Sequence, residues 1–429
     1  MDARCHCKMA LCFYRMGFCK VADYPKEMGT KRDGVNVMKE TREKKNRGLI
    51  IYLLGLFAVI VWNIVAWVSP AFCDWHIKYI LPIWLNTYAR LTSIFPFSVG
   101  EIMLLLAVLI TVFNTILLVW NLTQKGKYKN VVNRVWSIYA WIVLIVLVIM
   151  TANCSVFYHA SDFTEKYGRG GRTDEKAIAG FVDGQSYEEQ VYTKENLAIL
   201  RDYIVEQCNI LAEQVEHNEQ GDAIYEGDLS AESVRAMKKL GETYEQLSGF
   251  YVTPKYLTAS AFFSQQSILG YYFPFSMEAN MNSMMYITNI PATACHELSH
   301  TKGFLFEDDA NMVAFLACTQ SEDVFLQYSG YLSVLNYVNN EFYDSIGKNR
   351  EEYFRHVRIS EKVSHDNIFL TEENKQVMEK KAVIKTETVK EVSQTLMDTT
   401  LKLNGVEEGR QQYAKVVNLL LDYYYGILY

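Results

Sequence analysis

The stretch HELSHTKGFLFEDDAN, residues 296–311, combines an HExxH pattern with a glycine and an acidic cluster. On a helix, His296 and His300 lie one turn apart on the same face, so both imidazoles can bind one ion. Glu297, at the next position, then projects toward a water on that ion. Zinc accepts nitrogen and oxygen ligands and lowers the pKa of a water in its fourth position. We therefore expect a zinc site with Glu297 as the general base.

The third metal ligand has to come from the element that follows this helix. A turn through Gly303 folds a second helix back against the first, which favours Glu307 at its start as the ligand. Asn311 lies one helical turn further on and is expected to form a hydrogen bond with a ligating histidine. Asp308 and Asp309 remain alternatives for the third ligand, because they lie in the same acidic cluster.

The sequence around the motif predicts a mainly helical domain. Residues 291–301 form the HExxH helix, with Pro291 in its first turn. Residues 250–290 predict short strands, because aromatic and β-branched residues alternate with Pro, Gly and Asn turns. Further helices are expected at residues 186–217, 230–247, 307–327, 331–343, 371–402 and 407–427.

Three long apolar stretches precede this domain, at residues 49–68, 102–120 and 135–156. Each exceeds the roughly 18 apolar residues that identify a membrane-spanning helix. Basic residues cluster before the first stretch and between the second and third, so the positive-inside rule places the N-terminus in the cytoplasm. Three crossings then put the chain after about Tyr158 outside the cell membrane.

These patterns divide the chain into three parts. Residues 1–48 are a basic cytoplasmic segment, of which residues 1–37 are interpreted as a mis-assigned start or a disordered tail. Residues 49–158 form the membrane region, and residues 159–429 form the extracytoplasmic metallopeptidase-like domain. The expected fold is three transmembrane α-helices followed by a mainly α (α+β) zincin-like domain, with a short β-sheet before the HExxH helix.

Charge and cysteine content exclude some partners. The net charge is −7 and no basic stripe with interleaved aromatics occurs in the polar part, so no nucleic-acid partner is expected.

Five scattered cysteines are interpreted as buried apolar residues without disulfides: Cys73, Cys154, Cys208, Cys295 and Cys318. A weak second zinc candidate lies at the N-terminus: Cys5, His6, Cys7, Cys12 and Cys19.

The stretch HELSHTKGFLFEDDANMVAFLAC resembles an uncharacterised family of bacterial membrane proteins, common in Firmicutes, with an HELxH-x-x-GF-x-x-E-D-[ED]-AN signature. More distantly, it is similar to gluzincin zinc peptidases, whose second motif reads E-x-x-x-[DN]. That resemblance implies that His296, His300 and Glu307 bind zinc, Glu297 is the base and Asn311 supports a ligand. In those peptidases the glutamate lies much further along the chain, and aspartate is more usual at the position of Asn311.

The sequence thus predicts a membrane-anchored zinc metallopeptidase that hydrolyses peptide bonds in a peptide or protein substrate outside the bilayer. One alternative is a zinc-binding envelope sensor or scaffold without catalysis, and another is a zinc-free helical module. Neither the oligomeric state nor the substrate follows from the sequence. Candidate donors for the oxyanion of the transition state are Tyr272, Tyr328, Tyr331, Tyr413 and His356.

Overall fold

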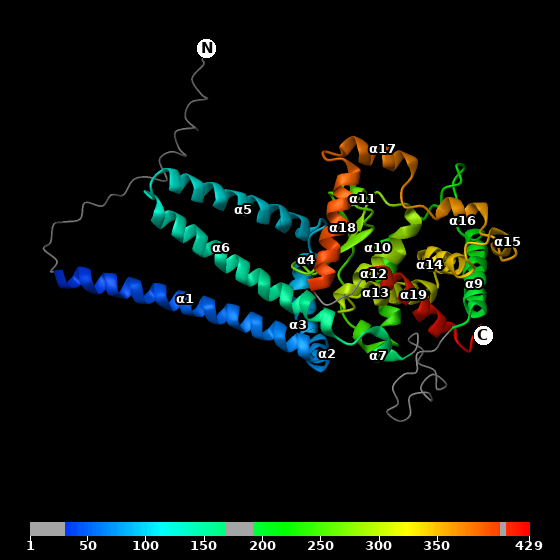
Figure 1. Ribbon diagram of the computed structural model, residues 1–429, viewed down its shortest axis with the longest axis horizontal. Helices are drawn as coiled ribbons and strands as arrows, with labels where there is room; N and C mark the ends of the chain where they lie inside the picture. The colour runs from blue at the N-terminus through cyan, green and yellow to red at the C-terminus, as the bar shows by residue number, and fades with distance from the viewer. Residues whose placement is uncertain (1–30, 169–191, 404–408) are drawn as a thin grey trace, which may run out of the picture. The chain divides into compact units, whose positions relative to one another are not determined.

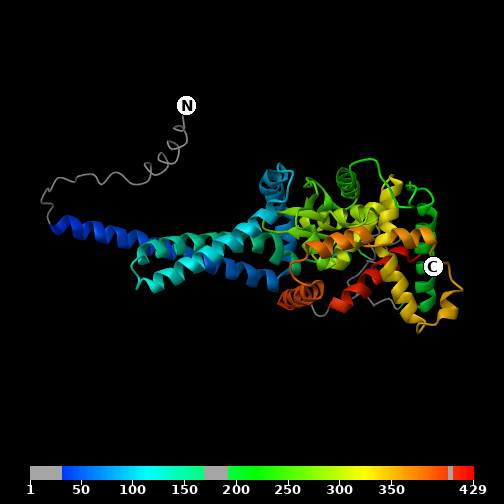
Figure 2. The same cartoon turned by 90° about the horizontal axis from the view of Figure 1, so that it is seen from above.

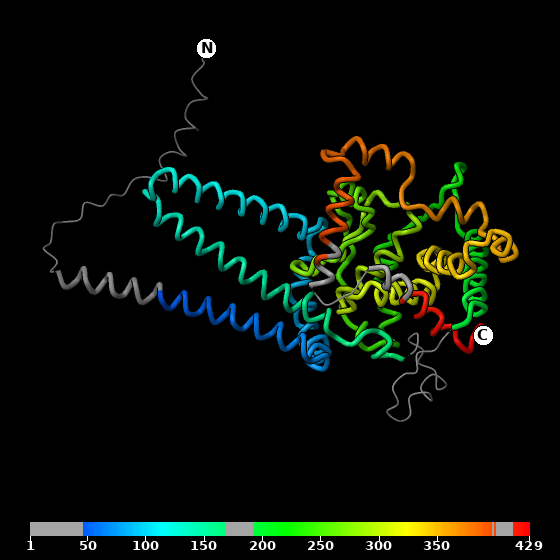
Figure 3. Tube along the Cα trace, in the orientation of Figure 1, coloured from blue at the N-terminus to red at the C-terminus, as the bar shows by residue number. Residues whose placement is uncertain are grey.

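The computed structural model describes residues 31–168, 192–403 and 409–429 (Figures 1 and 3). It divides into two units, residues 1–56 and 57–429, and the described part of the first unit is the beginning of helix α1, Lys31–Val68. The predictions for residues 1–30, including the N-terminal Cys/His cluster, lie outside the described residues.

Three helices are long and apolar enough to cross a bilayer, as predicted. They are Asn46–Val68 within α1, Val99–Thr123 (α5), and Lys129–His159, which comprises α6 (Lys129–Met150), a π-helix (Thr151–Ser155) and a 3-10 turn (Phe157–His159). Helices α5 and α6 form a hairpin whose turn contains Gly126 at a φ of +79° (Figure 1). Their side chains are mostly exposed, which fits a lipid environment.

The connection between the first and second apolar helices is itself helical, which the sequence reading missed. It contains α2 (Pro70–Tyr79), α3 (Leu81–Trp84), a π-helix (Leu85–Ala89) and α4 (Arg90–Ser93). Helix α2 begins where the Ser69 side chain accepts a hydrogen bond from Phe72 N and Pro70 occupies the first helical position. Its aromatic residues Trp75 and Tyr79 are exposed, as in helices that lie at a membrane surface.

The rest of the second unit is mostly helical with one small sheet, as predicted. Its helices before the HExxH segment are α7 (Phe163–Tyr167), α9 (Lys194–Ala212), α10 (Leu229–Leu240), α11 (Ser260–Gln265) and two 3-10 turns (Glu245–Leu247, Ile287–Asn289). Those from the HExxH segment onward are α12 (Ile290–Thr301), α13 (Glu307–Thr319), α14 (Val324–Ser345), α15 (Arg350–Tyr353), α16 (Glu361–Asp366), α17 (Glu372–Lys381), α18 (Thr386–Leu403) and α19 (Gly409–Tyr424).

Several predicted helices end earlier than expected or are interrupted. The helix predicted at residues 186–217 ends at Ala212, and the one predicted at residues 371–402 is divided into α17 and α18. For two others, the local chemistry explains where they end. The helix that starts at Glu307 ends at Thr319 instead of Gln327, because Asp323 caps a new helix by accepting hydrogen bonds from Phe325 N and Leu326 N. The helix predicted to reach Leu247 ends at Leu240. A Cβ at Gly241 would lie 2.5 Å from Leu247 O, so the chain turns back past this glycine at close range.

The sheet has the strand order β1-β3-β2, with β1 at Lys255–Leu257, β2 at Gly270–Phe273 and β3 at Glu278–Asn282. Strand β3 is fully buried, pairs parallel with β1 and antiparallel with β2, and both β2 and β3 pack against α12. The sheet therefore precedes and supports the HExxH helix, as predicted.

A buried ion pair ties this sheet to the start of α5. The Glu278 carboxylate accepts hydrogen bonds from Val99 N (3.1 Å) and Gly100 N (2.7 Å), and it pairs with the Lys255 ammonium. Lys255 Nζ also donates to the carbonyl oxygens of Thr92 (2.7 Å) and Phe97 (3.1 Å). The carboxylate therefore satisfies backbone N–H groups that a helix N-terminus leaves unpaired, and the apolar hairpin is an integrated part of the fold.

Replacing Glu278 with glutamine is expected to destabilise the protein by about 3–5 kcal/mol, because it leaves the Lys255 charge buried without its counter-ion. The measurement is thermal unfolding of the full-length protein in detergent. The matched control is Glu245→Gln, which removes the exposed ion pair with Lys78 and is expected to leave the unfolding temperature unchanged, because water screens this pair. Equal unfolding temperatures for the two variants would contradict this assignment.

Candidate metal centre

Two consecutive helices, α12 and α13, form the candidate centre. Helix α12 starts with Pro291 in its first turn, and ten of its residues are buried against the sheet and neighbouring helices. The turn to α13 passes through Gly303 at a φ of +91°, a conformation that favours glycine. A Cβ at Gly303 would also lie 3.0 Å from the Ile77 side chain of α2. The turn therefore needs this glycine for its backbone and for the space beside α2.

The turn brings three predicted ligands together. Nε2 of His296 lies 3.1 Å from Oε2 of Glu307, and Nε2 of His300 lies 3.9 Å from Oε1 of the same carboxylate. The two imidazole rings are 4.7 Å apart and nearly perpendicular. One ligand atom from each of the three residues lies within 4.8 Å of the other two, as a shared metal ion requires.

The second nitrogen of each imidazole has its own hydrogen-bond partner. Nδ1 of His296 lies 2.9 Å from Oδ1 of Asn311, as predicted for that residue, and Nδ1 of His300 lies 2.7 Å from the carbonyl oxygen of Phe304. Because a carbonyl oxygen only accepts, Nδ1 of His300 donates, and Nε2 is the nitrogen with which this residue could bind a metal. The donor set of two oriented imidazoles and one carboxylate fits zinc chemistry.

The alternative ligands Asp308 and Asp309 point elsewhere. Oδ2 of Asp309 accepts a hydrogen bond from Phe163 N at 3.0 Å, at the first residue of α7. Asp308 is buried, and neither aspartate belongs to the group that meets the two histidines among the described residues. Within the acidic cluster, Glu307 is the residue that the fold directs at the imidazoles.

Glu297 lies beside this group and is almost fully buried. Its Oε2 has no hydrogen-bond partner in the part of the chain that the structure describes. Burying a carboxylate oxygen without a partner is costly, and such atoms often have a chemical role or a water that they contact. This geometry fits a base that accepts a proton from a water at the centre.

Gly270 of β2 sets the position of Glu297. A Cβ at Gly270 would lie 2.6 Å from Oε1 and 2.7 Å from Cγ of Glu297, so the strand and the carboxylate can be neighbours only if residue 270 is glycine. The sequence reading missed this residue because the contact joins two distant elements.

If Glu297 is the base of a peptidase centre, Gly270→Ala is expected to lower turnover by about 100-fold, because displacing such a group by roughly 1 Å has an effect of that size. Zinc content should stay unchanged, since the three ligands are untouched. The assay compares zinc content and peptide cleavage with those of Gly48→Ala, whose added methyl group meets nothing within 4 Å. Full activity in Gly270→Ala would show that the position of Glu297 does not depend on β2.

The charges of the centre depend on one another. Burial lowers the pKa of His296, but the hydrogen bond and charge of Glu307 outweigh it and raise the pKa to about 9. Burial and the charge of His296 lower the pKa of His300 to about 4, and burial raises that of Glu297 to about 8. Burial opposes ionisation of Glu307, yet the bond to His296 and the charges of both histidines lower its pKa to about 2. Without a metal, His296 is therefore protonated and forms an ion pair with Glu307. The proton between them lies where a bound cation would lie.

The candidate oxyanion donors lie in other networks. The Tyr272 hydroxyl donates to Asn153 O at 3.1 Å, Tyr328 to Asp366 at 2.9 Å, and the Tyr331 hydroxyl lies 3.4 Å from that of Tyr203. Nδ1 of His356 lies 2.8 Å from Asp202. The side chain of Tyr413 lies outside the described residues. Of these candidates, the Tyr272 ring lies beside the centre, 6.2 Å from the His300 ring, and its hydroxyl is already bonded.

Together, these features define a protein with three apolar helices of membrane-spanning length and a mostly helical domain that carries a His/His/Glu group. The family described as "Protein of unknown function (DUF3810)" matches residues 76–421, and the chain belongs to this family. No curated protein and no solved structure matches the chain. The matched residues include the second and third apolar helices as well as the candidate centre.

Proposed function

We propose that the protein is a membrane-anchored zinc metallopeptidase whose metal is held by His296, His300 and Glu307. The observation that carries the proposal is the convergence of these three side chains next to Glu297, whose buried Oε2 has no hydrogen-bond partner among the described residues. A purely structural histidine pair would not need an adjacent buried carboxylate, so this oxygen favours the hydrolase over a non-catalytic zinc sensor or scaffold. The proposed orientation has the N-terminus in the cytoplasm and the centre outside.

A bound zinc ion supplies Lewis acidity and makes a water acidic enough to react near neutral pH. Glu297 removes the proton from the attacking water and later delivers it to the leaving amine, so that one carboxylate serves as base and then as acid. Asn311 and the carbonyl group of Phe304 hold the two imidazoles in the orientation described above.

The edge of β2 offers a binding place for an extended substrate. Asn282 N donates to Leu269 O, so in this antiparallel register Tyr271 and Phe273 exchange backbone hydrogen bonds with β3. The backbone groups of Gly270 and Tyr272 then point to the other side of β2. A peptide that pairs with this edge would pass directly beside Glu297, which Gly270 contacts.

The test is metal analysis and peptide cleavage by the purified full-length protein. We expect one zinc ion per chain, cleavage of a quenched-fluorescent peptide library, loss of cleavage after chelation, and recovery when zinc is restored. Stoichiometric zinc without any cleavage would favour the sensor or scaffold. A protein that takes up no zinc would overturn the proposal entirely.

A further inference from the structure

The third apolar helix ends directly beside the candidate centre. The ring of Tyr158, one residue before the end of that helix, lies 6.2 Å from the ring of Phe306, the neighbour of Glu307. In the π-helix of the same segment, Asn153 O accepts the hydrogen bond from Tyr272, whose ring packs beside His300. Two of the three metal-binding residues therefore lie next to residues that contact this helix end.

The second apolar helix starts close to the centre as well. Strand β2 contacts Glu297 at its first residue, Gly270, and Gly100 of α5 at its last, Phe273. A strand rises about 3.4 Å per residue, so about 10 Å of strand separates the residue that contacts Glu297 from the residue that contacts Gly100. The polar headgroup layer of a bilayer is roughly 5–7 Å thick on each side. This short path brings the centre within reach of the bilayer surface when α5 spans a membrane.

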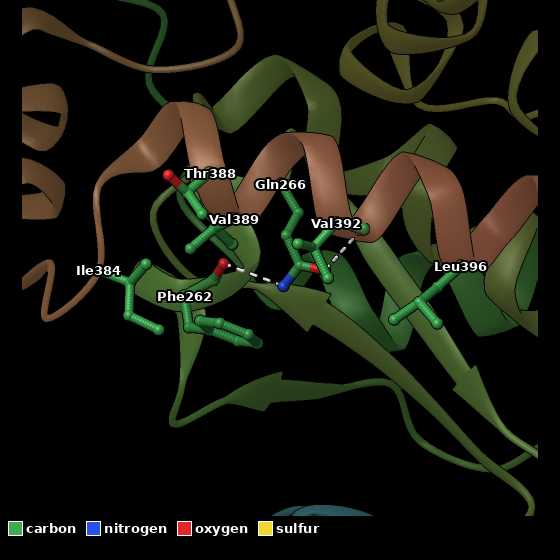
Figure 4. A pocket seen from close by; sticks show the side chains of 8 residues that line it. Phe262, Gln266, Ile384, Thr388, Val389, Val392 and Leu396 are labelled. Carbon is green, nitrogen blue, oxygen red and sulfur yellow. Dashed lines mark hydrogen bonds between the residues drawn. The ribbon is translucent and has the colours of Figure 1, made fainter.

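An apolar groove lies on the same side of the domain, next to a helix that contacts both α5 and β2. It lies between α11 and α18 and encloses about 200 Å³ (Figure 4). In Figures 1 and 2, both helices lie near the end of the domain from which α5 and α6 project. The residues that line the groove are Phe262, Gln266, Ile384, Thr388, Val389, Val392, Ser393 and Leu396.

Contacts join α11, one wall of this groove, to α5 and to β2. Glu101, in the first turn of α5, accepts hydrogen bonds from Thr258 N and Ala259 N, immediately before α11, both at 2.8 Å. At the other end, the ring of Phe263 lies 6.0 Å from that of Tyr271 in β2. Helix α11, which forms one wall of the groove, is thus held at the first turn of α5 and packs on the strand that contacts Glu297.

From these contacts we infer that the substrate is a membrane-anchored polypeptide, which is cut close to the bilayer surface and whose apolar flanking residues bind in the groove between α11 and α18. The inference rests on the proposed peptidase function and adds the substrate class. An anchored chain gains a high local concentration at a centre within reach of the bilayer surface, whereas a free peptide gains none. The groove supplies an apolar surface for side chains next to the anchor.

The experiment uses the full-length protein in phospholipid vesicles and two matched reporter libraries. Both carry the same randomised 12-residue segment, and one of them is joined to a single transmembrane helix. We expect the anchored library to be cut at least about 10-fold faster at equal bulk concentration, since tethering raises effective concentration. Mass spectrometry should place the cuts within about six residues of the anchor, because extended residues cover about 3.3 Å each.

A substitution in the groove tests what the groove contributes to cleavage, separately from the candidate metal centre. Val392→Asp puts a charge on an exposed groove residue and should slow cleavage of the anchored library at least 10-fold, with zinc content and unfolding temperature unchanged. The control is Ile210→Asp on α9, a similarly exposed apolar residue away from the groove, which should leave the rates for both libraries unchanged. Unchanged zinc content and unfolding temperature show that the variant is folded.

Each possible outcome decides the inference. Faster cutting near the anchor that depends on Val392 supports it. Equal rates for anchored and free libraries, or cuts spread along the segment, would overturn it and leave the peptidase proposal standing. Absence of cleavage of both libraries by zinc-loaded protein would contradict the peptidase proposal and the inference together.

Discussion

Replacing Glu297 with glutamine is expected to lower peptide hydrolysis by about 10²–10⁴-fold, the range attributed to a general base or acid. Glutamine has nearly the same shape as glutamate, so the packing against Gly270 should persist. It cannot accept a proton from water at neutral pH, however. Zinc content should remain at one ion per chain, because His296, His300 and Glu307 are unchanged. The measurements are zinc content and the turnover number on the same preparation.

A matched control for this variant is Glu322→Gln, a similar change at an exposed carboxylate between α13 and α14. It should leave both zinc content and turnover unchanged. If Glu297→Gln retained full turnover, Glu297 would not be the base. If it lost zinc as well as activity, Glu297 would act through the metal site, and the assignment of roles within the centre would be wrong.

The parts of the fold that depend on local spacing could be predicted from the sequence. The three apolar helices follow from continuous hydrophobic runs, and the meeting of His296, His300 and Glu307 follows from helical spacing and a short glycine turn. The partner of His296 was also accessible, because Asn311 lies one turn after Glu307 on α13. Whether the centre binds zinc remains a prediction from this geometry.

Contacts between distant segments could not be predicted. The need for Gly270 arises only when β2 packs against α12, more than twenty residues later in the chain. The Glu278 carboxylate likewise joins a strand to a helix N-terminus far upstream, at Val99 and Gly100. The spacing of residues along the sequence does not indicate which distant residues will be in contact. For the same reason, the sequence could not show which candidate oxyanion donors already have hydrogen-bond partners. The partner of the Tyr328 hydroxyl group, for example, depends on tertiary packing.

A graded loss of zinc affinity is expected when residues of the centre are changed one at a time. Glu307→Ala removes the carboxylate that meets both imidazoles and should weaken zinc binding by more than about 100-fold, because it deletes a ligand. Asn311→Ala leaves all three ligands in place and removes the partner of His296 Nδ1. Its expected effect is about 10–100-fold, the range for losing the hydrogen bond that orients a ligand.

The zinc affinity of each variant is measured by competition with a chelator of known affinity, on full-length protein in detergent. Glu322→Ala is the control variant, whose zinc affinity should not change. The order of effects distinguishes a metal centre from a packed histidine pair. In a centre, Glu307→Ala weakens binding most and the loss of turnover parallels the loss of zinc. If the three variants bound zinc equally, the ion would be held elsewhere. His296, His300 and Glu307 would then be an ordinary buried ion-pair network, in which the proton on His296 balances the carboxylate.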